Sequence, residues 1–189
     1  MLEKYEIGIK MAKSQMYKII IHRFMLNILQ MIRSFATAVP LGVCSAVIAL
    51  FVLKRHQSKT GKIIGKKKQN AIILLVSYIT IMAQMAILFR PWGTIHEIDW
   101  IPFDMYGGVR YIILYAAANA VVFLPIGILL PMIWTKMNRW RMVLLAGFLG
   151  SLFIELSQLL LQCGVVQTED LIMNTIGAGL GYWIIRKRI

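Results

Sequence analysis

Five apolar stretches alternate with charged connections, and the sign of the charge is sorted along the chain. No Asp or Glu lies between Glu6 and Glu97, and Lys/Arg clusters fill the connections 54–70 and 136–141 and the C-terminus. The acidic residues collect instead in the remaining two connections. A stretch of about 20 apolar residues spans the hydrocarbon layer of a bilayer. Because Lys and Arg are enriched in cytoplasmic loops, the pattern predicts a multi-pass membrane protein. The positions of the basic clusters also predict its orientation in the membrane.

The composition excludes several classes of protein. Apolar residues make up 59% of the sequence and charged residues 15%, whereas an ordinary soluble domain has about 25% charged residues. The net charge of +13 lies mostly in short loops, so we interpret it as orientation and attraction to anionic lipid and expect no nucleic-acid partner. Cys44 and Cys163 form no CxxC or Cys/His pattern, so we expect no disulfide, metal or cofactor.

The expected fold class is all-α, with about five transmembrane helices and one N-terminal amphipathic helix. A helical projection of residues 16–33 places most polar side chains on one half of the circle, which is typical of a helix lying in the membrane interface. We expect three regions: the amphipathic helix (1–33), the first span with its basic loop (34–70), and a four-helix core (71–189). The predicted spans are 35–53, 71–89, 111–134, 142–161 and 170–185.

The charge pattern also predicts which side of the cell membrane each connection faces. Placing the basic loop 54–70 in the cytoplasm puts the C-terminus there too, and puts connections 90–110 and 162–170 outside. The basic N-terminal segment then lies outside. Either its amphipathic helix rests on the outer leaflet, or the stretch 35–53 is re-entrant, so the side on which this helix docks stays open.

Polar side chains inside the spans mark a candidate site. Asn119 lies in the third span, Glu155 and Gln158 lie three residues apart in the fourth, and Asp170 and Asn174 lie four apart in the fifth. Residues spaced in this way share one face of a helix. Polar groups inside a bilayer turn away from lipid and pair with one another. Since Asn119, Glu155, Gln158 and Asn174 fall in the outer halves of their spans, and Asp170 opens the fifth span, we predict a polar pocket open to the outer face.

Each of these side chains also has a structural interpretation. The three amides could join helices by hydrogen bonds, and Asp170 could cap its helix. Glu155 needs a cationic neighbour when ionised, and Arg90 and Arg110, at the edges of the outer connection, are the nearest candidates. A structural Glu–Arg pair and a role in handling substrate or protons both fit this carboxylate.

Three sequence blocks resemble the VanZ family of small membrane proteins, which is named for a teicoplanin-resistance determinant. The blocks are D-x-x-P-F at 99–103, N-x-x-x-F-x-P-x-G at 119–127, and E-x-x-Q at 155–158 followed by D-x-x-x-N-x-x-G at 170–177. The resemblance covers roughly residues 70–185. The chain has Asp99 where the family usually has Asn, and it has Val165, Val166 and Gln167 in the linker before Asp170, where many relatives carry charged residues. The resemblance implies reduced susceptibility to lipoglycopeptides such as teicoplanin.

The first function that we consider is non-enzymatic binding of an amphiphile from the outer leaflet. The ligand would be a membrane lipid, a lipid-linked cell-wall precursor or a lipoglycopeptide. The polar residues of the spans would form the floor of its site. Arg90, Arg110 and Asp99 would form the rim, and the aromatic loop that contains Phe103 would form a lid.

Two further functions remain open. Glu155 and Asp170 could act as the acid/base pair of an intramembrane enzyme on a lipid-linked substrate. The sequence contains no HExxH, GxSxG or P-loop motif, which disfavours an enzyme. The chain could also be a scaffold subunit of an envelope complex. The sequence does not predict an oligomeric state.

Overall fold

The computed structural model describes residues 36–93, 95–99, 101 and 109–188, together with Leu29, Arg33 and Ser34. The chain divides into two compact units, Met1–Thr37 and Ala38–Ile189. The predicted amphipathic helix 16–33 lies outside the described residues, apart from Leu29 and Arg33.

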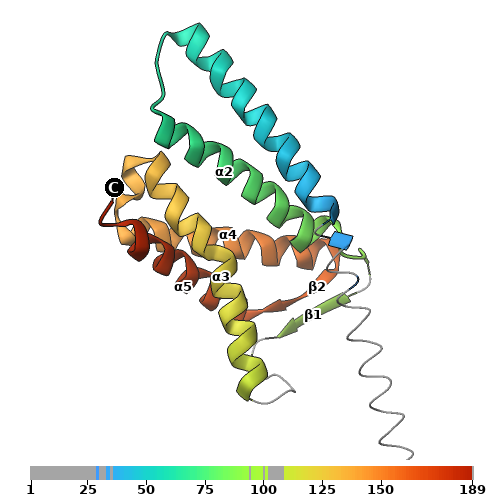
Figure 1. Cartoon of the computed structure of the whole chain (residues 1–189). Helices are drawn as coiled ribbons and strands as arrows, with labels where there is room; N and C mark the ends of the chain where they lie inside the picture. Colours follow the sequence, from blue (N-terminus) through green and yellow to red (C-terminus); the bar gives the residue numbers. More distant parts are fainter. Residues whose placement is uncertain are drawn as a thin grey trace, which may run out of the picture. The chain divides into compact units, whose positions relative to one another are not determined.

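Long helices account for most of the second unit (Figure 1). Each predicted span coincides with a helix, and the helices run past the apolar stretches into the flanking charged or polar residues. The described helices therefore confirm the all-α membrane fold. Their bounds are Ala36–Thr60, α2 at Lys66–Ala83, α3 at Val109–Ile133, α4 at Trp140–Leu161 and α5 at Thr168–Ile185. A π turn (Gln84–Leu88) extends α2, and a 3-10 turn (Thr135–Asn138) follows α3.

Four described helical segments are long and apolar enough to cross a membrane. They are Ala36–Thr60, Lys66–Leu88, Ala116–Ile133 and Trp140–Leu161. The helix α5 forms where the fifth span was predicted, but Glu169 and Asp170 occupy its first turn. These two acids lower the mean hydropathy of α5, and its crossing of the membrane stays a prediction.

Glycines allow α5 to lie directly against α3. Among the described elements, α5 packs most extensively on α3 and next on α4. A Cβ atom at Gly177 would overlap the carbonyl oxygen of Ala120, and one at Gly181 would overlap that of Leu124. Small residues let helix backbones approach closely inside a membrane. Gly177 and Gly181 therefore have a packing role.

The basic ends of the helices lie together. The Lys67 ammonium donates to the Arg188 carbonyl at 3.1 Å, and the Tyr182 hydroxyl donates to the Asn138 carbonyl at 2.7 Å. These bonds join the start of α2, the turn before α4 and the end of α5. The basic loop, the second basic connection and the C-terminus thus share one end of the bundle, as the charge pattern predicted.

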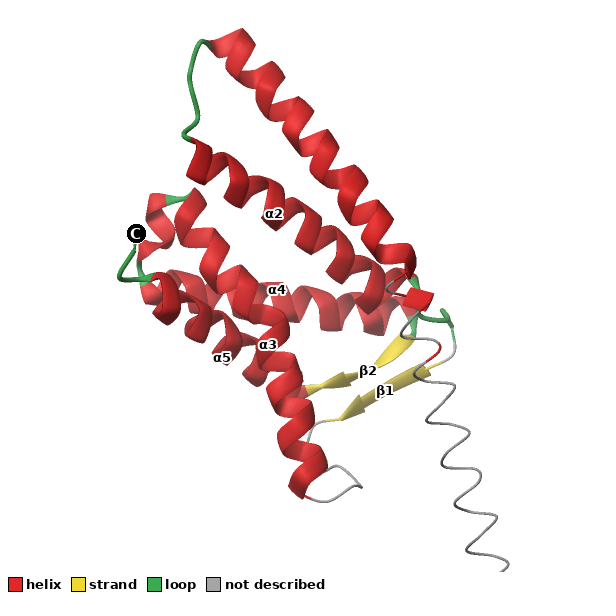
Figure 2. Ribbon diagram, in the orientation of Figure 1, coloured by secondary structure: helices red, strands yellow, loops and turns green. Residues whose placement is uncertain are grey.

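Two short parallel strands lie at the other end of the bundle (Figure 2). β1 (Ile95–Asp99) pairs with β2 (Cys163–Gln167), with Ile95 opposite Cys163 and Asp99 opposite Gln167. The sequence predicted neither strand, and the segment 162–169 was expected to be a plain linker. It instead contains β2 and the first turn of α5, which begins at Thr168. The pairing holds the long outer connection against the start of α5.

Candidate functional site

Buried polar side chains gather at the end of the bundle that carries the strands. With Asn119 and Asp170 they form a group that we call the polar cluster. Its members come from the π turn after α2, from α3, from α4 and from the first turns of α5. The buried members are Gln84, Ser151, Glu155, Gln158, Glu169 and Asn174.

Glu155 is 3% exposed and lies where α4 meets β2. Its Oε2 accepts a hydrogen bond of 3.2 Å from the backbone N–H of Gln167. The charges of Asp170, Arg90 and Glu169 also act on this carboxylate. The structure therefore brings Glu155 into range of the predicted cation Arg90 and of two further acids.

A chain of hydrogen bonds links α3, α4 and α5. The Asn119 side-chain amide donates to the Asp170 carboxylate. The Ser151 hydroxyl donates to the Asp170 carbonyl at 3.4 Å, and the Asn174 amide donates to the Ser151 hydroxyl at 2.8 Å. Three of the predicted site residues therefore share one network, and interhelical bonding is part of their role.

Gln158 connects α4 to the π turn. Its Nε2 donates to the Ala86 carbonyl at 3.0 Å, and a π turn leaves such a carbonyl without its usual helical partner. A Cβ atom on Gly164 would lie 2.6 Å from a guanidinium nitrogen of Arg90 and 2.9 Å from Oε1 of Gln158. Gly164 thus lets Arg90 and Gln158 approach β2, a role that the sequence did not reveal.

Gln84 and Glu169 are polar cluster residues that sequence reasoning missed. Glu169 is 1% exposed, and its Oε1 accepts from the Gln167 amide at 3.4 Å. Among the described residues, Glu169 Oε2 and Gln84 Oε1 are buried without a hydrogen-bond partner. Glu169 directly precedes Asp170, and Gln84 lies near the end of the second apolar stretch. These two positions were weak sequence evidence for a place in the site.

Asp99, a predicted rim residue, is the last residue of β1. Its Oδ1 accepts from the Ile101 N–H at 3.2 Å, and its carbonyl accepts from the Thr168 hydroxyl at 3.1 Å. Asp99 therefore fixes the strand end beside the first residue of α5. The predicted lid residue Phe103 and the side chain of Arg110 lie outside the described residues.

No group of three or more His, Cys, Asp or Glu that could hold a metal ion occurs among the described residues. The described side chains of the polar cluster can form hydrogen bonds or carry charge.

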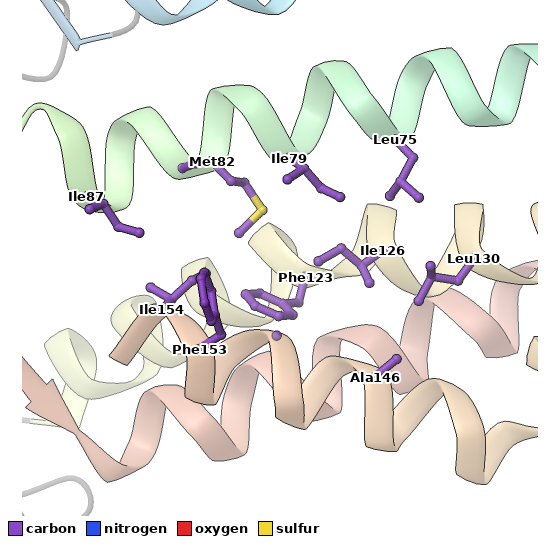
Figure 3. A pocket seen from close by; sticks show the side chains of 12 residues that line it. Leu75, Ile79, Met82, Ile87, Phe123, Ile126, Leu130, Ala146, Phe153 and Ile154 are labelled. Atoms are coloured by element: carbon purple, nitrogen blue, oxygen red, sulfur yellow. The ribbon is translucent and has the colours of Figure 1, made fainter. Parts of the chain in front are cut away.

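An apolar cavity of about 300 Å³ lies between α2, α3 and α4. Figure 3 shows Ile79 and Met82 of α2 facing Phe123 of α3, with Phe153 and Ile154 of α4 beside them. The lining residues are Leu75, Ile79, Met82, Ala83, Ile87, Phe123, Ile126, Leu130, Ala146, Gly150, Phe153 and Ile154.

Cavity-lining residues and polar cluster residues are neighbours in the sequence. Ile154 lines the cavity and Glu155 follows it, while Ala83 lines the cavity and Gln84 follows it. Apolar lining and buried polar groups thus lie on neighbouring positions of the same two helices. The arrangement suits a molecule with an alkyl chain and a polar head.

Comparison with known proteins gives one match. Residues 70–188 match the family model described as VanZ/LLP1, a segment that contains the whole polar cluster. No curated protein and no solved structure matches the chain.

Proposed function

The chain belongs to the VanZ/LLP1 family, and we propose that it binds an amphiphile from the outer leaflet of the cell membrane. The ligand is a membrane lipid, a lipid-linked cell-wall precursor or a lipoglycopeptide. Binding it lowers susceptibility to teicoplanin-type antibiotics. In this proposal the basic end of the bundle faces the cytoplasm and the polar cluster faces outward.

One observation supports the proposal: residues of the polar cluster directly follow cavity-lining residues on α4 and at the end of α2. An alkyl chain that leaves lipid for the cavity gains little hydrophobic free energy, because lipid tails are as apolar as the lining. Affinity then depends on the head group, which would meet groups that lipid cannot provide. Buried polar groups that lack partners favour a ligand that satisfies them.

Each of the two candidate catalytic acids has a protein hydrogen-bond partner. Glu155 accepts from the Gln167 N–H, and Asp170 accepts from Asn119. A carboxylate with one such bond can still bind a ligand or exchange a proton. We retain binding as the function because the cavity between α2, α3 and α4 has room for an alkyl chain.

Filling the cavity tests the proposal. Ala146 lines the cavity, so the ring of Ala146→Phe would occupy the space of the alkyl chain and keep the head group from reaching the polar cluster. We expect the retained amphiphile to fall roughly tenfold. Native mass spectrometry of gently purified protein measures this retention. Cells that express Ala146→Phe should also lose the protection against teicoplanin that the unchanged protein gives.

The neighbouring residue supplies the control. Leu145 is 49% exposed and does not line the cavity, so Leu145→Phe adds an aromatic ring to the same helix turn without filling the cavity. We expect Leu145→Phe to retain the amphiphile. Full retention by Ala146→Phe as well would reject the cavity as the binding site.

A further inference from the structure

The charges around Glu155 are unequal in sign. Three carboxylates, Glu155, Glu169 and Asp170, act on one another, and Arg90 is the cation whose charge also reaches Glu155. An anionic head group placed here would face more negative than positive charge. A cationic head group would be attracted.

The hydrogen-bonding groups of the polar cluster also favour a cationic head group. The amide donors of the cluster are engaged with protein acceptors: Asn119 with Asp170, Gln158 with the Ala86 carbonyl, and Asn174 with Ser151. The atoms left over are oxygens, Oε2 of Glu169 and Oε1 of Gln84. An amide oxygen only accepts hydrogen bonds, and so does an ionised carboxylate.

We propose that the head group received by the polar cluster is a primary ammonium group, which carries positive charge and three hydrogen-bond donors. This inference rests on the proposed function and names the head group of its amphiphile. The ammonium group sits at Glu169 and Glu155, whose carboxylates both bind Gln167. It donates to the unpaired oxygen of Glu169, which is 1% exposed.

The position of Glu169 makes this site more than a group of acids on a surface. Its carboxylate is buried, one oxygen is bonded to Gln167, and the other has no partner among the described residues. Leaving a buried acceptor without a donor is costly. A bound ammonium group removes that cost, whereas a phosphate brings further acceptors and increases it.

Three amphiphiles with the same decyl chain test the head group: decylammonium, decyltrimethylammonium and decyl phosphate. Each is titrated against the full chain in lipid nanodiscs, and native mass spectrometry measures the bound fraction. We expect decylammonium to bind at least roughly tenfold more tightly than decyl phosphate. Decyltrimethylammonium, which has the charge but no N–H donor, should bind between the two.

Each outcome decides a separate claim. Tightest binding of decyl phosphate would overturn the inference and leave the proposed function standing. Equal binding of the two ammonium compounds would overturn the role of N–H donors. Failure of all three to bind would reject the proposed function itself. Methylammonium, tested alongside, shows whether the head group binds without its chain, and tight binding of it would overturn the need for an amphiphile.

A variant tests whether Glu169 causes the preference for an ammonium over a phosphate head group. Glu169→Gln removes one negative charge and replaces the carboxylate with an amide, so the ratio of decylammonium to decyl phosphate affinity should fall roughly tenfold. Ser157→Ala, on the last turns of α4, removes a hydroxyl that donates to the Phe153 carbonyl and should keep the ratio. An unchanged ratio in folded Glu169→Gln protein would overturn the assignment to Glu169.

Discussion

Gly181→Ala is expected to destabilise the bundle by forcing α5 away from α3. The added Cβ would overlap the carbonyl oxygen of Leu124 and lie 3.0 Å from the Cα of Gly127. Both of these atoms are backbone, so α3 and α5 would have to move apart. Overpacking of this kind costs about 1–3 kcal/mol, and sometimes more. The melting temperature in detergent should fall, together with the yield of monodisperse protein.

Gly179→Ala is the matched control on the same helix. A Cβ there would meet only the end of the Leu144 side chain, at 2.9 Å, and that side chain can rotate away. Replacing Gly by Ala inside a helix gains about 1 kcal/mol in helix propensity. We therefore expect Gly179→Ala to melt at or above the temperature of the unchanged protein. Equal melting temperatures for the two variants would contradict the close packing of α3 on α5.

Glu155→Gln is expected to have the largest effect on ligand binding. The substitution keeps the size of the side chain and an oxygen that can accept from the Gln167 N–H. It removes one of the three negative charges at this end of the bundle. Charge-assisted hydrogen bonds contribute about 1.5–3 kcal/mol, so the retained amphiphile should fall roughly tenfold or more. Protection against teicoplanin should be lost with it.

The same variant separates the two interpretations of Glu155. If the carboxylate only joined α4 to β2, Glu155→Gln would leave the bound amphiphile unchanged, because the amide oxygen can still accept from the Gln167 N–H. If it receives the ligand, the bound amphiphile falls and the melting temperature of ligand-free protein changes little. Ser157→Ala on the same helix should alter neither quantity.

The parts of the site that the sequence predicted are those set by periodicity within one helix. Glu155 and Gln158, three residues apart, and Asp170 and Asn174, four apart, project from one face of α4 or α5 as expected. The sorting of charge placed these residues at the end opposite the basic loops. The pairing of Asn119 with Asp170 then follows from the need of polar groups in a membrane to find one another.

The strands could not be predicted because their pairing is not local. Ile95–Asp99 and Cys163–Gln167 are five residues long, too short for an alternating pattern to stand out. Each finds its strand partner in the other, across two intervening helices. Gly164 was missed for the same reason, since only the fold brings Arg90 beside it.

The cavity and the unpaired oxygens depend on packing between helices. Met82, Phe123 and Ile154 are ordinary apolar residues in the sequence, and only their positions on three helices enclose a space. Gln84 and Glu169 looked like the polar end of a span and an acid in a connection. Their burial, at 4% and 1% exposed, became visible only in the structure.

Photo-crosslinking tests most directly whether one amphiphile occupies both the cavity and the polar cluster. A decylammonium analogue with a diazirine near the end of its chain is bound in nanodiscs and irradiated, and labelled peptides are sequenced. We predict labels on cavity residues such as Met82, Phe123 and Ile154, and their loss in Glu155→Gln. Labels confined to lipid-facing residues such as Leu145, or unchanged by Glu155→Gln, would contradict a shared site.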